Sequence, residues 1–365
     1  MMAADGGSVN ERILELITDR SLDLQRFTAS QRREISAFLK ELGAEIVAQI
    51  ARIDPMGVDQ ASYQSQRLNK LLQQVRETIR TAYRARGAEL TGELKELAEI
   101  EAAFAASSVN SAVGVSLMTD GMTRGQLSAL LDGVLVQGAP ISEWWERQAG
   151  DTLQRFTDQM RLGIAQGETI GQLIRRVRGG TQGGEPVSGI MSTSRHHADA
   201  LVRSATQAVS QKARQATYEG NADLLKGIMW ASTLDLRTTV GCAARDNKLY
   251  SVKDHKPLDH DLPWENGPGQ RHWGCRSTSA PVTKSWRDIG FDIDDLPAST
   301  RASMNGQVPQ DTSFEAWLAK KTKAQQNEAL GPGRADLWRD GKLTFRDLVD
   351  ARGRELTLEQ LRQRF

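Results

Sequence analysis

Apolar residues recur at helical spacing along the N-terminal third of the chain, on narrow stripes of long, charge-rich segments. A first helix carries the stripe that begins at Ile13. A second is expected to start near Thr28, whose hydroxyl forms a capping-box pattern with Gln31. A third runs from about Leu68 to Ile100. Such stripes predict elongated helical hairpins rather than a globule.

The pattern changes to shorter helices between residues 123 and 220. Thr169 and Gln172 predict another capping box, and the glycine-dense segment 179–189 predicts a mobile loop. The next helix, from Ser194 to about Tyr218, shows a face of small residues that suits close packing.

Strand-like segments follow at 227–232 and 248–252, and another strand is expected after Cys275. The tail from residue 311 is helical, with caps at Thr312 and Thr357 and a break at 330–333. We therefore predict a predominantly helical α+β protein in three parts. These are an elongated helical N-terminal region (1–122), a compact α+β domain (123–298, with helices in 123–220 and a small antiparallel sheet and loop in 227–286) and a short helical C-terminal tail (299–365).

Composition narrows the class of protein. With 365 residues and a net charge of +1, the chain lacks the overall basic charge typical of duplex-binding proteins. Its two cysteines exclude a disulfide-stapled secreted scaffold. The N-terminus has no signal-peptide pattern, and serines interrupt the apolar stretch 102–118, so we expect neither export nor a membrane contact. A reducing cytoplasm is the expected environment.

Candidate chemistry concentrates between Trp230 and Trp286, which holds both cysteines. Cys242 lies at one end of a long polar loop, and His272-x-x-Cys275 lies at the other. Thiolates and imidazole are the ligands that zinc prefers, and His255, His260 or Asp235 is a candidate fourth ligand. A structural zinc would anchor a loop of unusual length. The alternatives are cysteines packed as small apolar residues or an intramolecular disulfide.

Enzymatic interpretations find less support. The glutamate and the Pro-Cys-x-x-Cys pair of zinc deaminases are missing, as are a Walker phosphate loop, a Gly-x-Ser-x-Gly turn and a His-Glu-x-x-His helix. A metal-dependent nuclease that uses the loop 255–275 remains an alternative. Another is a single-strand-binding module in which Trp230, Trp264, Trp273 and Trp286 stack on bases, although a small-domain core is the simpler use. We expect no enzyme.

One further local cluster lies shortly before Cys242. Asp235 and Arg237 are two residues apart, so on a strand they would share a face and pair or anchor the loop. The order of motifs is Arg203-Ser204 on a helix, Trp230, Asp235-x-Arg237-Thr238, Cys242, Asp246-Asn247-Lys248 and His272-x-x-Cys275-Arg276-Ser277, with Pro281 after them. In the tail, Phe314-x-x-Trp317-Leu318 and Arg334-x-x-Leu337-Trp338-x-x-Gly341-Lys342-Leu343 follow.

In this order the motifs resemble the Mu F-like family of phage minor head proteins, also called phage head morphogenesis proteins. The resemblance covers roughly residues 150–350. Thr239 stands where many members carry a cysteine, and Asn247 where a glycine is usual. The matching signature residues are Arg203, Trp230, Asp235, Arg237, Thr238, Cys242, His272, Cys275 and Arg276.

The resemblance implies a non-catalytic head protein, present in few copies, that acts in head morphogenesis and in DNA packaging or ejection. The implied partners are the portal protein, other capsid or inner-head proteins and packaged DNA. The implied location is the virion, at the capsid interior or the portal vertex, after assembly in the host cytoplasm. The long N-terminal helices are expected to dock with the portal or an inner-capsid partner.

Overall fold

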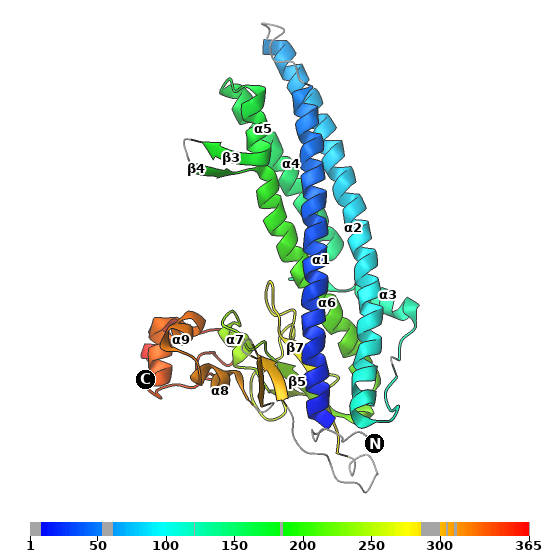
Figure 1. The fold of residues 1–365 in the computed structure, drawn as a ribbon, viewed down its shortest axis with the longest axis vertical. Helices are drawn as coiled ribbons and strands as arrows, with labels where there is room; N and C mark the ends of the chain where they lie inside the picture. The colour runs from blue at the N-terminus through cyan, green and yellow to red at the C-terminus, as the bar shows by residue number, and fades with distance from the viewer. Residues whose placement is uncertain are drawn as a thin grey trace. The chain divides into compact units, whose positions relative to one another are not determined.

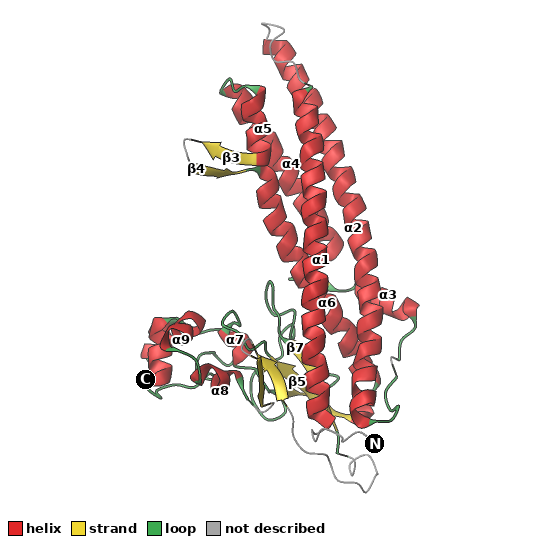
Figure 2. Ribbon diagram, viewed as in Figure 1, coloured by secondary structure: helices red, strands yellow, loops and turns green. Residues whose placement is uncertain are grey.

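A computed structural model describes residues 9–52, 61–119, 121–182, 185–285, 300–303, 306–309 and 312–364. It confirms the predicted α+β class, with long and short helices and small antiparallel sheets (Figures 1 and 2). The helices are α1 Val9–Ala51, α2 Ala61–Val113, α3 Arg124–Asp132, α4 Ile141–Ala165, α5 Ile170–Arg178, α6 Ile190–Gly220, α7 Val240–Ala243, α8 Phe314–Ala319, α9 Lys323–Leu330, α10 Pro332–Arg339 and α11 Leu358–Arg362, with a 3-10 turn at Ala222–Leu224. The strands are β1 Leu135–Val136, β2 Ala139–Pro140, β3 Gly179–Gln182, β4 Glu185–Ser188, β5 Leu225–Ala231, β6 Leu249–Tyr250, β7 Thr278–Thr283, β8 Thr300–Ser303 and β9 Gly306–Pro309.

The described chain forms two compact units. The helical unit comprises residues 26–96 and 133–206, and the sheet unit comprises residues 9–25, 97–132 and 207–365. Each unit therefore draws on segments from both sides of residue 122, while the expected boundary at 298 lies outside the described residues. The division into three consecutive domains stays a prediction.

The predicted break before Thr28 is wrong, because α1 continues from Val9 to Ala51 as one helix of 43 residues. The side chain that would have closed a capping box at this point is used between helices instead. In the helical unit, Gln31 Oε1 accepts a hydrogen bond of 2.9 Å from Arg86 Nη2 on α2. This contact replaces the local cap, and the apolar stripe runs on without interruption. The expected turn at 54–57 lies outside the described residues.

Aromatic and hydroxyl side chains join the helices of the helical unit. The Tyr83 ring of α2 meets Trp145 of α4 edge-on, with ring centroids 5.7 Å apart. Its hydroxyl is 3.0 Å from Thr152 Oγ1, which is 2.8 Å from Ser194 Oγ on α6. This series of hydrogen bonds gives each buried hydroxyl a partner, and a buried hydroxyl without one would destabilise the core.

The glycine-dense segment 179–189 was expected to be a mobile loop, and that expectation is wrong. It forms the antiparallel hairpin β3–β4, in which Gly179 pairs with Ser188. A Cβ at Gly179 would lie 2.8 Å from Val187 O and from Gly189 N, and the residue has φ of 81°. Glycine is therefore required by the close approach of two backbones, not by flexibility.

A three-stranded antiparallel sheet of order β6-β5-β7 is the centre of the sheet unit. It confirms the strands expected near 227–232, near 248–252 and after Cys275. One side of the sheet packs against helix segments from the beginning of α1 and the end of α2. The shared core contains Ile13, Leu14, Ile17, Ala105, Val109, Tyr218, Leu225, Ile228 and Ala280.

The C-terminal tail packs on residues that follow β5. Leu234, Val240 and Leu262 share a core with tail residues, which include Phe314, Trp317, Leu318, Phe345, Leu348 and Leu361. The cap expected at Thr312 is wrong by one residue, because Ser313 Oγ accepts from Ala316 N. The capping boxes at Thr169 and Thr357 and the break at Gly331 are confirmed. Among the described helices, none is long and apolar enough to span a membrane.

Candidate functional site

The two ends of the long polar loop meet in the structure. Cys242 lies on the one-turn helix α7, whose first backbone donors are capped by Thr239. Cys275 ends a turn in which its N–H donates to His272 O at 3.1 Å, just before β7. Cys242 Sγ is 3.8 Å from Cys275 Sγ and 3.4 Å from His272 Nε2. We call these three residues the Cys–His cluster.

Both sulfurs of the Cys–His cluster are buried free thiols, and His272 is half-buried. A separation of 3.8 Å between the sulfurs is not that of a disulfide bond. The hydrogen bond from Cys275, together with the bond to His272, holds the pKa of Cys242 well below its ordinary value. The same contact with Cys242, and burial, raise the pKa of Cys275, while Cys242 raises the pKa of His272. The cluster thus favours one thiolate, at Cys242.

Aromatic rings enclose the Cys–His cluster. Trp230 of β5 and Tyr250 of β6 are fully buried beside the two cysteines. Trp264 meets both rings edge-on, with centroid distances of 5.6 and 4.9 Å. Trp230 is therefore a core residue, and half-buried Trp264 already stacks on His255. Trp273 is 41% exposed, and Trp286 lies outside the described residues.

A buried arginine, which sequence analysis missed, joins the segment around Cys242 to the polar loop. Arg245 donates to Gly241 O, Pro263 O and Glu265, and its guanidinium lies 5.6 Å from the Trp230 ring centroid. Burial lowers its pKa. The only signal in the sequence was a charged residue three positions after Cys242, in a segment that is otherwise small and apolar.

Asp235 does not pair with Arg237, because the two residues lie in a turn and not on a strand. Arg276 instead binds both carboxylate oxygens of Asp235, and its Nη2 is 2.7 Å from Oδ1. Arg237 contributes its backbone N–H to the same carboxylate, while its side chain is exposed. Thr238 Oγ1 donates to Thr233 O. The Asp-x-Arg-Thr motif therefore forms a turn, and Asp235 binds this turn to Arg276, the residue after Cys275.

The neighbouring Asp246-Asn247-Lys248 motif also has a structural role. Asp246 accepts hydrogen bonds from Ser232 N after β5 and from Phe314 N at the start of α8, each of 2.8 Å. Asn247 has φ of 61°, a conformation that glycine and asparagine tolerate best. This explains how asparagine serves at a position where the resemblance led us to expect glycine.

The histidines of the loop do not assemble a nuclease-like centre. His255 stacks on Trp264 at 4.7 Å and accepts from Gln215, while His260 Nε2 donates to Leu249 O. Asp254 is paired with Lys256, and Asp261 with Arg346. Among the residues that the structure describes, three side chains with metal-binding atoms converge at the Cys–His cluster. None of the fourth ligands proposed from the sequence, His255, His260 or Asp235, belongs to it.

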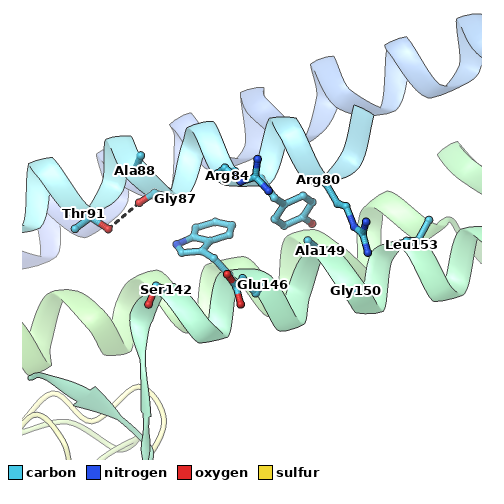
Figure 3. A pocket seen from close by; sticks show the side chains of 12 residues that line it. Arg80, Arg84, Gly87, Ala88, Thr91, Ser142, Glu146, Ala149, Gly150 and Leu153 are labelled. Atoms are coloured by element: carbon cyan, nitrogen blue, oxygen red, sulfur yellow. Dashed lines mark hydrogen bonds between the residues drawn. The ribbon is translucent and has the colours of Figure 1, made fainter. Parts of the chain in front are cut away.

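Two further features lie in the helical unit. Arg203 is exposed on α6. A cavity of about 610 Å³ lies between α2 and α4, where Gly87, Ala88, Ala149 and Gly150 leave space beside Trp145 (Figure 3). Arg80 and Arg84 line the same cavity. We assign no ligand to it.

The sheet and the enclosed Cys–His cluster define a small α+β module in which Cys242 contacts His272 and Cys275, and Asp235 binds Arg276. Residues 154–280 match the family described as "Phage Mu protein F like protein". The match runs from within α4 to β7 and includes every signature residue from Arg203 to Arg276, which confirms the expected resemblance. Comparison with curated proteins and with solved structures gave no match.

Proposed function

We propose that this chain is a phage minor head protein that acts as a structural component in head morphogenesis. The observation that carries the proposal is the family match over residues 154–280. The module's geometry supports a structural role, because the side chains of Asp235, Arg276 and Asp246 are engaged in contacts that hold its elements together. Asp235 binds Arg276, and Asp246 joins β5 to α8.

A null mutation tests this proposal in the phage or prophage that encodes the chain. Introducing a stop codon early in the reading frame should give aberrant or empty heads, seen by electron microscopy, and a loss of infectious particles. Supplying the wild-type chain in trans should restore both. Normal filled heads in the absence of the chain would contradict the proposal.

We further propose that the α1–α2 segment of the helical unit binds the portal protein or an inner-capsid partner. Its support is that α1 and α2 carry charged, exposed positions over many turns, including Arg33 and Lys40 seven residues apart on one face. Deleting the N-terminal helices is an unsuitable test, because Ile13 and Leu14 belong to the core of the sheet unit.

Charge reversal in the full chain is a sharper test of portal binding. Arg33→Glu with Lys40→Glu should reduce capture of the chain by immobilised portal protein. The matched control reverses two exposed tail lysines, Lys320→Glu with Lys323→Glu, and should bind as wild type does. Equal capture of all three proteins would remove α1 from the interface.

Contact with packaged DNA is the third part of the proposal. Arg76, Arg80 and Arg84 are exposed at four-residue spacing on α2 and therefore share one face. Replacing all three with glutamine should weaken binding to a short DNA duplex. The slope of log K against the logarithm of the salt concentration should become shallower by up to about 3, the value for three lost phosphate contacts. An unchanged salt dependence would exclude these arginines as a DNA contact.

A further inference from the structure

We propose that Cys242, His272 and Cys275 bind one zinc ion that ties α7 to the turn before β7. The inference is independent of the proposed function, because it rests on the geometry of the Cys–His cluster. The three donor atoms lie within 4.8 Å of one another. Two cysteines and one histidine are ligands that zinc prefers, and two thiolates balance its charge.

The distances agree with those between ligands of a single tetrahedral ion. With Zn–S of about 2.3 Å and Zn–N of about 2.05 Å, tetrahedral angles separate two sulfurs by about 3.8 Å and a sulfur from a nitrogen by about 3.6 Å. The two sulfurs of the cluster are 3.8 Å apart, and Cys242 Sγ is 3.4 Å from His272 Nε2. The third pair, Cys275 Sγ and the His272 ring nitrogen, lies within 4.8 Å, so these two side chains would approach each other by up to about 1.2 Å to share one ion.

The orientation of His272 also suits a ligand. Its Nδ1 is 3.0 Å from Trp273 O, and a carbonyl oxygen only accepts, so Nδ1 carries the proton. The lone pair of the neutral ring then lies on Nε2, which faces Cys242. A histidine ligand commonly donates its other ring N–H to a backbone carbonyl, which fixes both tautomer and ring plane.

Solvent takes the fourth position in this proposal. The nearby Thr239 Oγ1, 3.2 Å from His272 Nε2, already accepts from Cys242 N as the cap of α7. His272 is half-buried, whereas both cysteines are buried, so solvent would reach the ion from the side of His272. Because Thr239 faces the same nitrogen, Thr239→Cys would add a third thiolate where the coordination is incomplete.

Such an ion would have a structural role. It would close the segment 243–271, which contains Trp264 and the β6 strand, and its binding free energy would add to the folding free energy, because the unfolded chain lacks the assembled site. Burial of both sulfurs beneath Trp230 and Tyr250 suits a fixed ligand rather than a reactive thiol.

Metal analysis of the purified full chain tests the proposal. After saturation with zinc and dialysis, we expect about one zinc per chain, and chelation should lower the melting temperature. Cys242→Ser, Cys275→Ser and His272→Ala should each lose the zinc, whereas exposed His196→Ala on α6 should retain it. A folded wild-type chain without stoichiometric zinc, or without free thiols because a disulfide has formed, would overturn the proposal.

Two measurements remain decisive if the ligand variants fail to fold. Cobalt bound to the wild-type chain should give the near-ultraviolet thiolate charge-transfer band and intense visible bands of a tetrahedral site. Thr239→Cys should hold zinc more tightly than wild type in competition with a chelator. A cobalt spectrum without thiolate bands, or no gain in affinity for Thr239→Cys, would contradict the assigned ligands.

Discussion

Gly353 shows how a single residue of the tail is fitted to the module. Its φ of 75° is unfavourable for other residues, and a Cβ there would overlap the buried Arg245 guanidinium. Its carbonyl also accepts from Arg271 Nη2 at 2.8 Å. The absence of a side chain at Gly353 thus lets the tail approach Arg245 and Arg271.

We expect Gly353→Ala to destabilise the chain more than Gly341→Ala does. Gly341 has a similar φ of 70°, but a Cβ there meets no atom within 4 Å. Gly341→Ala should therefore cost only the left-handed backbone penalty of about 1–2 kcal/mol. Gly353→Ala should cost about 1–3 kcal/mol more, because Arg245 must move. Equal urea-unfolding midpoints for the two variants would show that the Arg245 side chain moves aside without a measurable cost.

Asp235 should make stability depend on pH. Burial raises the pKa of its carboxyl group, but the hydrogen bonds and charge of Arg276 outweigh burial, so the pKa lies below its ordinary value. A lowered folded-state pKa stabilises the protein above the unfolded pKa of about 3.9, and this contribution is lost as the pH falls through the folded value.

Asp235→Asn should therefore lower the free energy of unfolding by about 1–3 kcal/mol at neutral pH. The difference from wild type should be constant between about pH 5 and pH 7 and should shrink below about pH 4. Urea unfolding of both proteins at a series of pH values measures it. A difference that persists unchanged in acid would mean that Asp235 acts by shape and not by charge.

At the scale of elements, a buried ion triad joins three helices of the sheet unit. Glu101 of α2 is fully buried between Arg20 of α1 and Arg214 of α6, at 2.7 and 2.6 Å. Ser210 Oγ donates to the same carboxylate at 2.9 Å. This triad fixes the alignment of α1, α2 and α6 beside the sheet.

Removing the charge of Glu101 should be costly, because two arginines, one of them fully buried, would lose their common partner. We expect Glu101→Gln to destabilise the sheet unit by about 3–5 kcal/mol. Glu99→Gln is the matched control on the same helix. It removes an ion pair with Arg124, which is 84% exposed, and should cost at most about 1 kcal/mol. Similar urea midpoints for the two variants would contradict a structural role for the triad.

The sequence predicts elements with a strong local signal. The stripe of α2, the strands β5 to β7 and the capping boxes at Thr169 and Thr357 follow from periodicity and side-chain chemistry. Errors occurred where distant contacts outweigh local ones: Gln31 binds Arg86 instead of capping a helix, and Gly179 serves a hairpin. Whether Cys242 lies close to Cys275 could not be predicted from the sequence, because a long loop separates them. Arg245 had no distinctive pattern around it.

At the scale of the whole molecule, the family match covers only part of each compact unit. Sheet residues of the matched segment, such as Ile228 and Ala280, share one core with Ile13, Leu14 and Val109. Leu234, Val240 and Leu262 share another core with tail residues. Both cores therefore need residues from outside the matched segment.

A fragment of residues 154–280 should consequently not fold by itself. Exposed core positions such as Ile228 and Val240 should make it aggregate or bind a hydrophobic dye. The full chain, purified in the same way, should show a cooperative unfolding transition. Circular dichroism and urea unfolding compare the two, and a cooperative transition in the fragment would show that the matched segment is an autonomous domain.

The most direct test of the account is the protein composition of purified, DNA-filled phage particles, measured by quantitative mass spectrometry. A structural head component should be present in those particles, in few copies relative to the major capsid protein. Finding the chain only in the infected-cell lysate, and never in purified heads, would contradict its assignment as a head protein.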